Sequence, residues 1–242
     1  MSALSQLGAM SCCWALLACS SGQVLVGIDH GVDVDSGASG SSGAGDPTAS
    51  ELLAALGTCN EISNGELAPE SGRTADVPIC GLATAVYWRS EFAVDCDGKT
   101  TSTCNSNTDS QFGDSTVGKD SMGNSLDAAA VPYVEVPAAS ATFKYVSAGL
   151  NMGSVAAVVY KDHLAYAVIG HEQAADTIGS GSYALAERLD IDPNPKTGGL
   201  ESESVTYVAF TGASNQVSAL EDEAQAITLG KAAAAALIAS AH

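Results

Sequence analysis

Side chains that can transfer protons gather between residues 171 and 180 of this 242-residue chain. His171 has an ordinary pKa near neutrality and can in principle act as a general acid or base, although a plain polar loop residue is the commoner role. Glu172 and Asp176 offer carboxyl groups in the same stretch. Ser180 ends it, but an unactivated hydroxyl neither holds charge nor delivers a proton at a useful pKa. Of these four residues, only the first three have side chains that can take part in acid–base chemistry.

The elements that must position these side chains are mostly short strands. Residues 153–160, GSVAAVVY, form a continuous apolar run typical of a buried strand, and residues 163–169 form a hairpin with it across Lys161 and Asp162. Turns are expected after Ile169 and after Ile178. Three further strands are expected at residues 83–94, at 205–210 and, as an edge strand between prolines, at 131–137.

Helices are fewer than strands. They are expected at residues 49–56 with Ser50 as the N-cap, at 182–189, and in the Ala-rich stretch 219–239. Six or so short strands with few helices predict a mainly β fold, a small closed barrel.

Three regions are expected along the chain. Residues 1–19 look like an export signal, because residues 9–18 are apolar and too short to span a membrane. The sequence Leu-Leu-Ala-Cys ending at Cys19 resembles a lipoprotein cleavage site, so a lipid anchor and simple secretion both stay open. Residues 20–49 contain a Gly/Ser/Asp-rich stretch that predicts a disordered linker. The folded domain is expected over residues 50–242.

The cysteines agree with export. Three of the seven lie within residues 1–19, which leaves four in the body of the chain: Cys59, Cys80, Cys96 and Cys104. An even number in an exported chain predicts two disulfides with three possible pairings, of which we favour the two local ones, 59 with 80 and 96 with 104. A zinc site is the weaker alternative, because no close Cys-x-x-Cys pair occurs.

The charge restricts the partners. With 28 acidic and 9 basic residues the chain has a net charge of −19, which repels nucleic acids and anionic lipids. The same field attracts a polycation, although many secreted proteins are acidic for solubility alone. The sequence shows no cofactor or metal motif, and we expect neither. We also expect a monomer.

The stretch YKDHLAYAVIGHEQAADTIGSGSYALA, residues 160–186, resembles the active-site segment of the fungal and bacterial endo-chitosanases of glycoside hydrolase family 75. In that family an Asp follows the Gly of the first turn and a Glu follows the Gly of the second, and these carboxylates are the catalytic pair. This chain has His171 and Ser180 at those positions. Further segments resemble the family in the same order: 86–98, 104–105, 123–137 and 189–212.

The resemblance implies a double-psi-barrel-like hydrolase that acts on chitosan, a polycation when its amines are protonated. Cleavage with inversion uses two carboxyl groups about 6.5–9.5 Å apart, one as acid and one as base. Because both family positions are replaced, Glu172 and Asp176 are candidate substitutes, and Asp95 and Asp97 are candidate substrate-binding residues. For all these acids the commoner role is a solvated or turn-capping carboxylate.

Three aromatic residues, Trp88, Tyr166 and Tyr183, can stack on sugar faces, although such rings more often belong to the core. Two functions follow from the resemblance: a secreted endo-chitosanase with impaired activity, or a non-catalytic protein that binds chitosan or another polycation. A third possibility is another barrel hydrolase, for example one acting on peptidoglycan.

Overall fold

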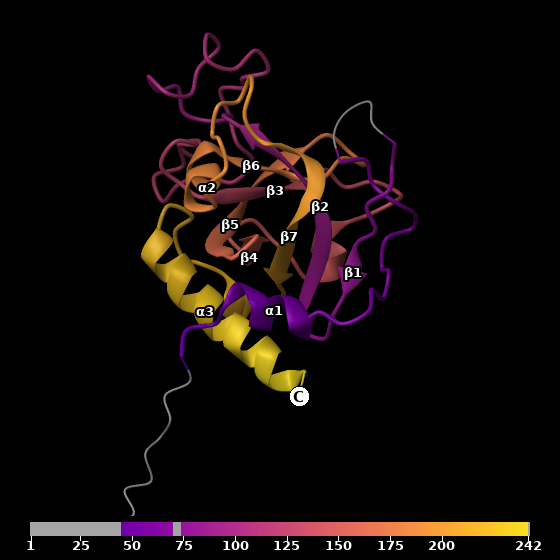
Figure 1. Cartoon of the computed structure of the whole chain (residues 1–242). Coiled ribbons are helices and arrows are strands. Elements are labelled where there is room, and N and C mark those ends of the chain that lie inside the picture. Colours follow the sequence, from indigo (N-terminus) through magenta and orange to yellow (C-terminus); the bar gives the residue numbers. More distant parts are fainter. Residues whose placement is uncertain (1–44, 70–73, 242) are drawn as a thin grey trace, which may run out of the picture. The chain divides into compact units, whose positions relative to one another are not determined.

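Apolar runs of β-branched and aromatic residues form the strands, and six of the strands close into a barrel (Figure 1). The computed structural model describes residues 45–69 and 74–241. Around the ring the strands follow the order β2, β6, β3, β5, β4, β7, and β7 pairs again with β2. The small closed barrel expected from the sequence is confirmed.

The elements have the following bounds. The strands are β1 (Cys80–Gly81), β2 (Ala85–Asp95), β3 (Tyr133–Pro137), β4 (Val155–Tyr160), β5 (His163–Gln173), β6 (Ser180–Ser182) and β7 (Leu200–Phe210). The α-helices are α1 (Ala49–Ala55), α2 (Tyr183–Arg188) and α3 (Glu223–Ser240), and the 3-10 helices are η1 (Tyr145–Ala148) and η2 (Ala213–Asn215).

The hairpin of β4 and β5 is confirmed, with Lys161 in the left-handed conformation at its turn. The turn expected after Ile169 is wrong, because β5 continues to Gln173. The reason is a parallel partner far away in the sequence: β3 pairs with β5 on both sides of this point, and the register shifts by one residue at Gly170. A Cβ at position 170 would lie 2.6 Å from Cβ of Tyr133, so only glycine fits at this bulge.

The edge-strand prediction for β3 is also wrong. This strand lies between β5 and β6, and all five of its residues are buried. The polar member of its alternating pattern, Glu135, is only 5% exposed. The alternation of VPYVEVP therefore reflects two buried faces of different polarity rather than one solvated face.

The barrel core is aromatic at one side. Trp88 of β2 stacks on Tyr207 of β7 with ring centroids 5.2 Å apart, and Phe92 stacks on the same tyrosine at 6.4 Å. All three side chains are at most 1% exposed. Stacked rings joining β2 to β7 stabilise the seam at which the barrel closes.

Helix α1 begins one residue before the predicted cap. Its N-cap is Thr48 and not Ser50: the Thr48 hydroxyl accepts the Glu51 N–H, and the Glu51 carboxylate accepts the Thr48 N–H. This reciprocal capping box needs Glu three residues after the cap, and only Thr48 satisfies that spacing here.

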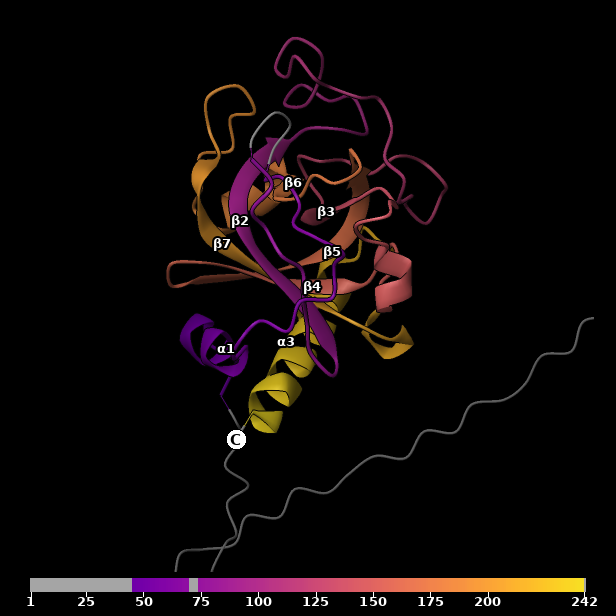
Figure 2. The same ribbon diagram turned by 90° about the vertical axis from the view of Figure 1, so that its right-hand side faces the viewer.

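Helix α3 packs beside α1 at one end of the barrel, while the loops between β2 and β3, drawn in magenta, lie at the opposite end in both views (Figures 1 and 2). The predicted Ala-rich helix is thus confirmed as a packing helix. Its buried side consists of Ala226, Gly230, Ala234 and Leu237. Small residues at this spacing let the helix approach the strands closely.

Substituting Gly230 by Val is expected to lower the free energy of unfolding by about 1–3 kcal/mol, because a Cβ there would overlap the ring of Tyr166 on β5. The measurement is urea unfolding followed by circular dichroism. Ala236→Val, on the exposed side of the same helix, lowers the helix propensity slightly but makes no such overlap, so it should cost less than Gly230→Val. Equal losses in both variants would contradict this packing.

The predicted export signal, the possible lipidation site at Cys19 and most of the predicted linker lie within residues 1–44, outside the described residues. The described residues, 45–69 and 74–241, form one compact unit. None of the helices in the described ranges is long and apolar enough to cross a membrane.

Candidate active site

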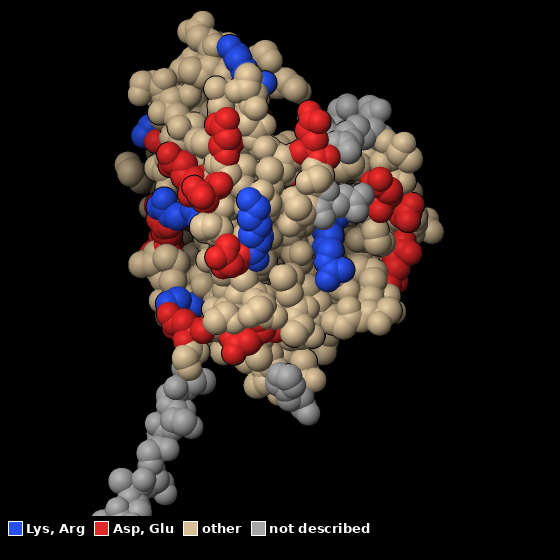
Figure 3. Space-filling model, in the orientation of Figure 1, with Lys and Arg blue, Asp and Glu red and all other residues tan. Residues whose placement is uncertain are grey.

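A polar cleft of about 740 Å³ opens where β2, β3, β5 and β6 come together. Its lining is rich in carboxyl groups, which come from Glu91, Asp95, Asp97, Asp109, Glu135, Glu172 and Glu201. Among the described residues that line it, Lys196 is the only lysine or arginine. Acidic side chains are also spread over the face of the molecule shown in Figure 3. The cleft therefore favours a cationic ligand.

Both replaced family positions lie at this cleft. His171 comes from β5 and Ser180 from the first position of β6, which pairs in parallel with β2 at Ala93. Residues nine apart in the sequence are thus brought to one cavity wall by two different strands. Neither of the two residues supplies a carboxylate.

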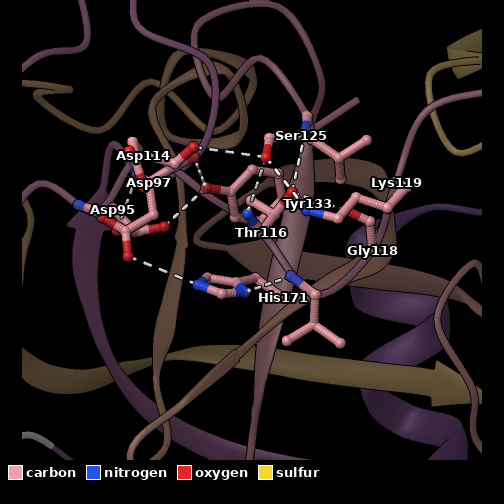
Figure 4. A network of polar contacts seen from close by, with 12 residues as sticks. Asp95, Asp97, Asp114, Thr116, Gly118, Lys119, Ser125, Tyr133 and His171 are labelled. Atoms are coloured by element: carbon pink, nitrogen blue, oxygen red, sulfur yellow. Dashed lines mark hydrogen bonds and ion pairs between the residues drawn. The ribbon is translucent and has the colours of Figure 1, made fainter. Parts of the chain in front are cut away.

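His171 is held on both ring nitrogens (Figure 4). Its Nδ1 accepts the backbone N–H of Val117 at 3.0 Å, and its Nε2 lies 3.5 Å from Oδ2 of Asp97. In the neutral ring the proton must then be on Nε2, and the lone pair of Nδ1 is already used. The His171 side chain is only 12% exposed, and its ring contacts both the loop at Val117 and Asp97.

Asp95 and Asp97 meet at the end of β2. Asp95 accepts the Tyr133 hydroxyl at 2.7 Å and the Asp97 N–H at 3.1 Å, while Asp97 accepts the Gly113 N–H at 2.5 Å. Between them, Cys96 is fully buried. These contacts hold both carboxylates against the cleft wall.

Glu135 is the partner of Asp95 that sequence reasoning missed. Its carboxyl group forms a hydrogen bond with that of Asp95, and burial together with the Asp95 charge raises the pKa of Glu135 well above its ordinary value. Burial also raises the pKa of Asp95, although hydrogen bonds from Glu135 and Tyr133 oppose this shift. Two carboxyl groups in hydrogen-bond contact disfavour the doubly ionised state, and the larger rise in pKa falls on Glu135. A lone acid inside an apolar strand was the available signal.

The two proposed substitutes differ in position. Glu172 lines the cleft, and its Oε1 accepts the Tyr145 hydroxyl at 2.7 Å. Burial and this hydrogen bond raise the pKa of Tyr145 to about 12. Asp176 is exposed, has a left-handed backbone and accepts the Ser140 hydroxyl at 2.5 Å, and it does not line the cleft.

The three aromatic candidates are not together. Trp88 lies in the core with 1% exposure, and Tyr166 is 8% exposed beneath Gly230 of α3, so neither ring has a face open to a sugar. Tyr183 lines a second cavity of about 440 Å³, which shares Pro195 and Lys196 with the cleft. Of the three, Tyr183 alone lies beside a space that a sugar can reach.

Within residues 45–69 and 74–241 no group of three or more His, Cys, Asp and Glu side chains is arranged to hold a metal ion. The zinc alternative for the four cysteines is therefore not supported in this part of the chain. Both predicted disulfides are present instead: Cys59 with Cys80, and Cys96 with Cys104.

The disulfide between Cys96 and Cys104 closes a short loop, and replacing both residues by Ser is expected to lower the free energy of unfolding by about 2.5 kcal/mol. The same change should weaken ligand binding, because the disulfide fixes the backbone between the carboxylates on either side of Cys96. Replacing Cys59 and Cys80 should cost about 3.3 kcal/mol without affecting the cleft. Thermal unfolding and calorimetric titration of a glucosamine hexamer separate the two effects. A binding loss in both variants would contradict the anchoring role.

A comparison with known protein families identifies the family of this chain. A family model described as the fungal chitosanase of glycosyl hydrolase group 75 matches residues 92–233, more than half of the chain. The match begins in β2 and ends in α3, so it includes most of the cleft. No curated protein matches the chain.

Proposed function

The chain belongs to the fungal chitosanases of glycosyl hydrolase group 75, and from this premise we propose that it binds chitosan in the acidic cleft and hydrolyses its β-1,4 linkages. The rate is reduced, because neither His171 nor Ser180 supplies the carboxylate that the family resemblance expects. The observation that carries the proposal is the concentration of carboxyl groups at the same cleft that holds both family positions.

The electrostatics support a cationic sugar polymer. A concave site walled by one sign of charge concentrates ligands of the opposite sign. Each protonated amine of chitosan can meet a carboxylate of this wall, while an acetylated sugar brings no charge. The two disulfides fit an exported protein that meets its polymer outside the cell, either secreted or held at the surface through Cys19.

Binding is expected to be much tighter for a glucosamine hexamer than for an N-acetylglucosamine hexamer, and to weaken as salt screens the charges or as rising pH removes the amine protons. Isothermal titration at pH 5 and pH 8, each at low and high salt, measures this. Equal affinity for the two hexamers, without salt dependence, would sink the proposal.

The second candidate is a non-catalytic chitosan binder. It is favoured by one observation, that the ring of His171 is held on both nitrogens and has no lone pair left for acid–base work. Binding does not distinguish the two functions, but release of reducing ends from soluble chitosan does. Sustained release by the purified protein supports the hydrolase, and binding without release supports the binder.

A further inference from the structure

One carboxyl pair in the cleft has the properties of a proton donor without standing at either family position. Glu135 is 5% exposed, is hydrogen-bonded to Asp95, and lines the cleft together with His171 and Ser180. Burying a carboxyl group carries a desolvation penalty, so such a pair in a buried strand costs stability. A role in the chemistry of the cleft would explain why it is there.

The surroundings orient the pair. The Tyr133 hydroxyl and the Asp97 N–H both donate to Asp95, one to each of its oxygens. The Glu135 carboxyl group forms a hydrogen bond with the same group, so the pair can hold a proton between two carboxyl groups that are fixed in place. Tyr133 and Glu135 are two residues apart on β3, and the bulge at Gly170 sets the register of that strand against His171.

We propose that the Asp95–Glu135 pair is the proton donor for glycosidic cleavage in this chain, in place of the carboxylates absent from positions 171 and 180. This inference rests on the proposed function. The proton of the pair passes to the glycosidic oxygen as the bond from C1 to that oxygen breaks. Water adds its oxygen to C1, and the proton it releases returns to the pair through the solvent of the cleft, so the net reaction consumes one water per bond.

The other candidates are less suited to this task. His171 already uses both ring nitrogens, the hydrogen-bond partner of Glu172 is a tyrosine hydroxyl rather than a second carboxyl group, and Asp176 lies outside the cleft lining. Ser180 has no proton of useful pKa. Compared with these four residues, the pair combines a hydrogen bond between two carboxyl groups with a place in the cleft wall.

A raised carboxyl pKa is what a general acid needs near neutral pH, and burial supplies it here. The titratable groups facing the pair are Asp97, whose charge raises both carboxyl pKa values, and Tyr133. The remaining titratable side chains of the cleft wall are Glu91, Asp109, His171, Glu172, Lys196 and Glu201.

The test compares Glu135→Gln with the natural protein on soluble chitosan from pH 4 to pH 8. Gln keeps the shape of Glu135 and can donate to Asp95, but it has no transferable proton. We expect kcat to fall by about 10²–10⁴-fold with unchanged affinity for a glucosamine hexamer. The natural kcat should decline at high pH as the pair loses its proton, and this limb should vanish in the variant. The matched control is Asp162→Asn, which also removes one acid, from a side chain that is 94% exposed at the β4–β5 turn. This variant should keep the natural kcat.

A second background separates catalysis from structure. In a variant that carries His171→Asp and Ser180→Glu, the family positions do the chemistry, and Glu135→Gln should then cost little. A merely structural pair would cost the same in both backgrounds. Asp95→Asn gives a second reading on the pair if Glu135→Gln does not fold.

Each outcome has its own meaning. If the natural protein hydrolyses chitosan and Glu135→Gln does so equally well, the pair is not the proton donor, and the proposed function still holds. Binding of the hexamer without any hydrolysis also overturns the pair, and identifies a binder. If the protein neither binds the hexamer nor hydrolyses chitosan, the proposed function itself is wrong.

Discussion

Restoring both family carboxylates, with His171→Asp and Ser180→Glu in one variant, is expected to raise the rate of chitosan hydrolysis by at least about 10²-fold. Each general acid or base contributes typically about 10²–10⁴-fold, and both positions already face the same cleft. Carboxylates introduced at these two positions would therefore lie at the cleft without any change of the backbone. The measurement is release of reducing ends from soluble chitosan under saturating conditions.

The local contacts of position 171 decide how the new carboxylate behaves. A carboxylate there can still accept the Val117 N–H, but it replaces a ring that lies 3.5 Å from Oδ2 of Asp97. Two like charges this close raise one of the two pKa values. We expect this to favour the acid role for one member, and the rate optimum of the variant should follow that pKa.

The control is His171→Asn with Ser180→Gln, which has similar shapes but no carboxylates. It should bind a glucosamine hexamer as the restored variant does and show no gain in rate. A restored variant that folds and binds but hydrolyses no faster would mean that the strands no longer hold positions 171 and 180 at a productive separation.

The sequence predicted those parts of the fold that depend on local patterns. Apolar runs and Ala-rich periodicity placed the β4–β5 hairpin and α3, and the even number of body cysteines led to the two local disulfides. Strand number and length suggested a small barrel, and the family resemblance implied it. The pairing order around the ring is non-local, and no pattern within one segment contains it.

The errors share that origin. β5 continues past Gly170 because β3, more than thirty residues earlier in the chain, gives it a parallel partner. β3 looked like an edge strand because a charged residue in an alternating pattern usually faces water, whereas Glu135 faces a buried carboxyl group. Trp88 and Tyr166 are the opposite case, because their aromatic rings are of a type that can bind a sugar, but both are buried in the core.

The buried pair leads to a second large effect, this time on stability. Glu135→Gln is expected to stabilise the protein at neutral pH although it removes a hydrogen-bonded acid. The pKa of Glu135 is raised by folding, mainly by burial. Well below the unfolded value near 4.5 the group is protonated in both states and carries no pH-dependent penalty. As pH rises above that value, the unfolded chain releases its proton and the folded protein keeps it.

The free energy of unfolding then falls with pH, by up to about 1.36 kcal/mol per pH unit, until the folded pKa is passed. Gln does not titrate, so the variant lacks this loss. Its advantage over the natural protein should be small at pH 4 and should grow steadily toward pH 8. Urea unfolding at five pH values measures the difference, with Asp162→Asn as the control for a simple change of net charge.

A pH-independent difference, or one that shrinks as pH rises, would show that Glu135 does not retain its proton in the folded protein. The expected result is a stability advantage of Glu135→Gln that grows with pH. If the same variant also loses hydrolysis, the two results together show why Glu135 is retained. A side chain whose removal raises stability and lowers activity is kept for its chemistry, because functional sites hold groups that the fold alone would not favour. Glu135 is a buried acid in the middle of a barrel strand. At neutral pH it keeps its proton because it is buried, and this lowers the stability of the folded protein. A role in catalysis explains such a residue better than a packing role does.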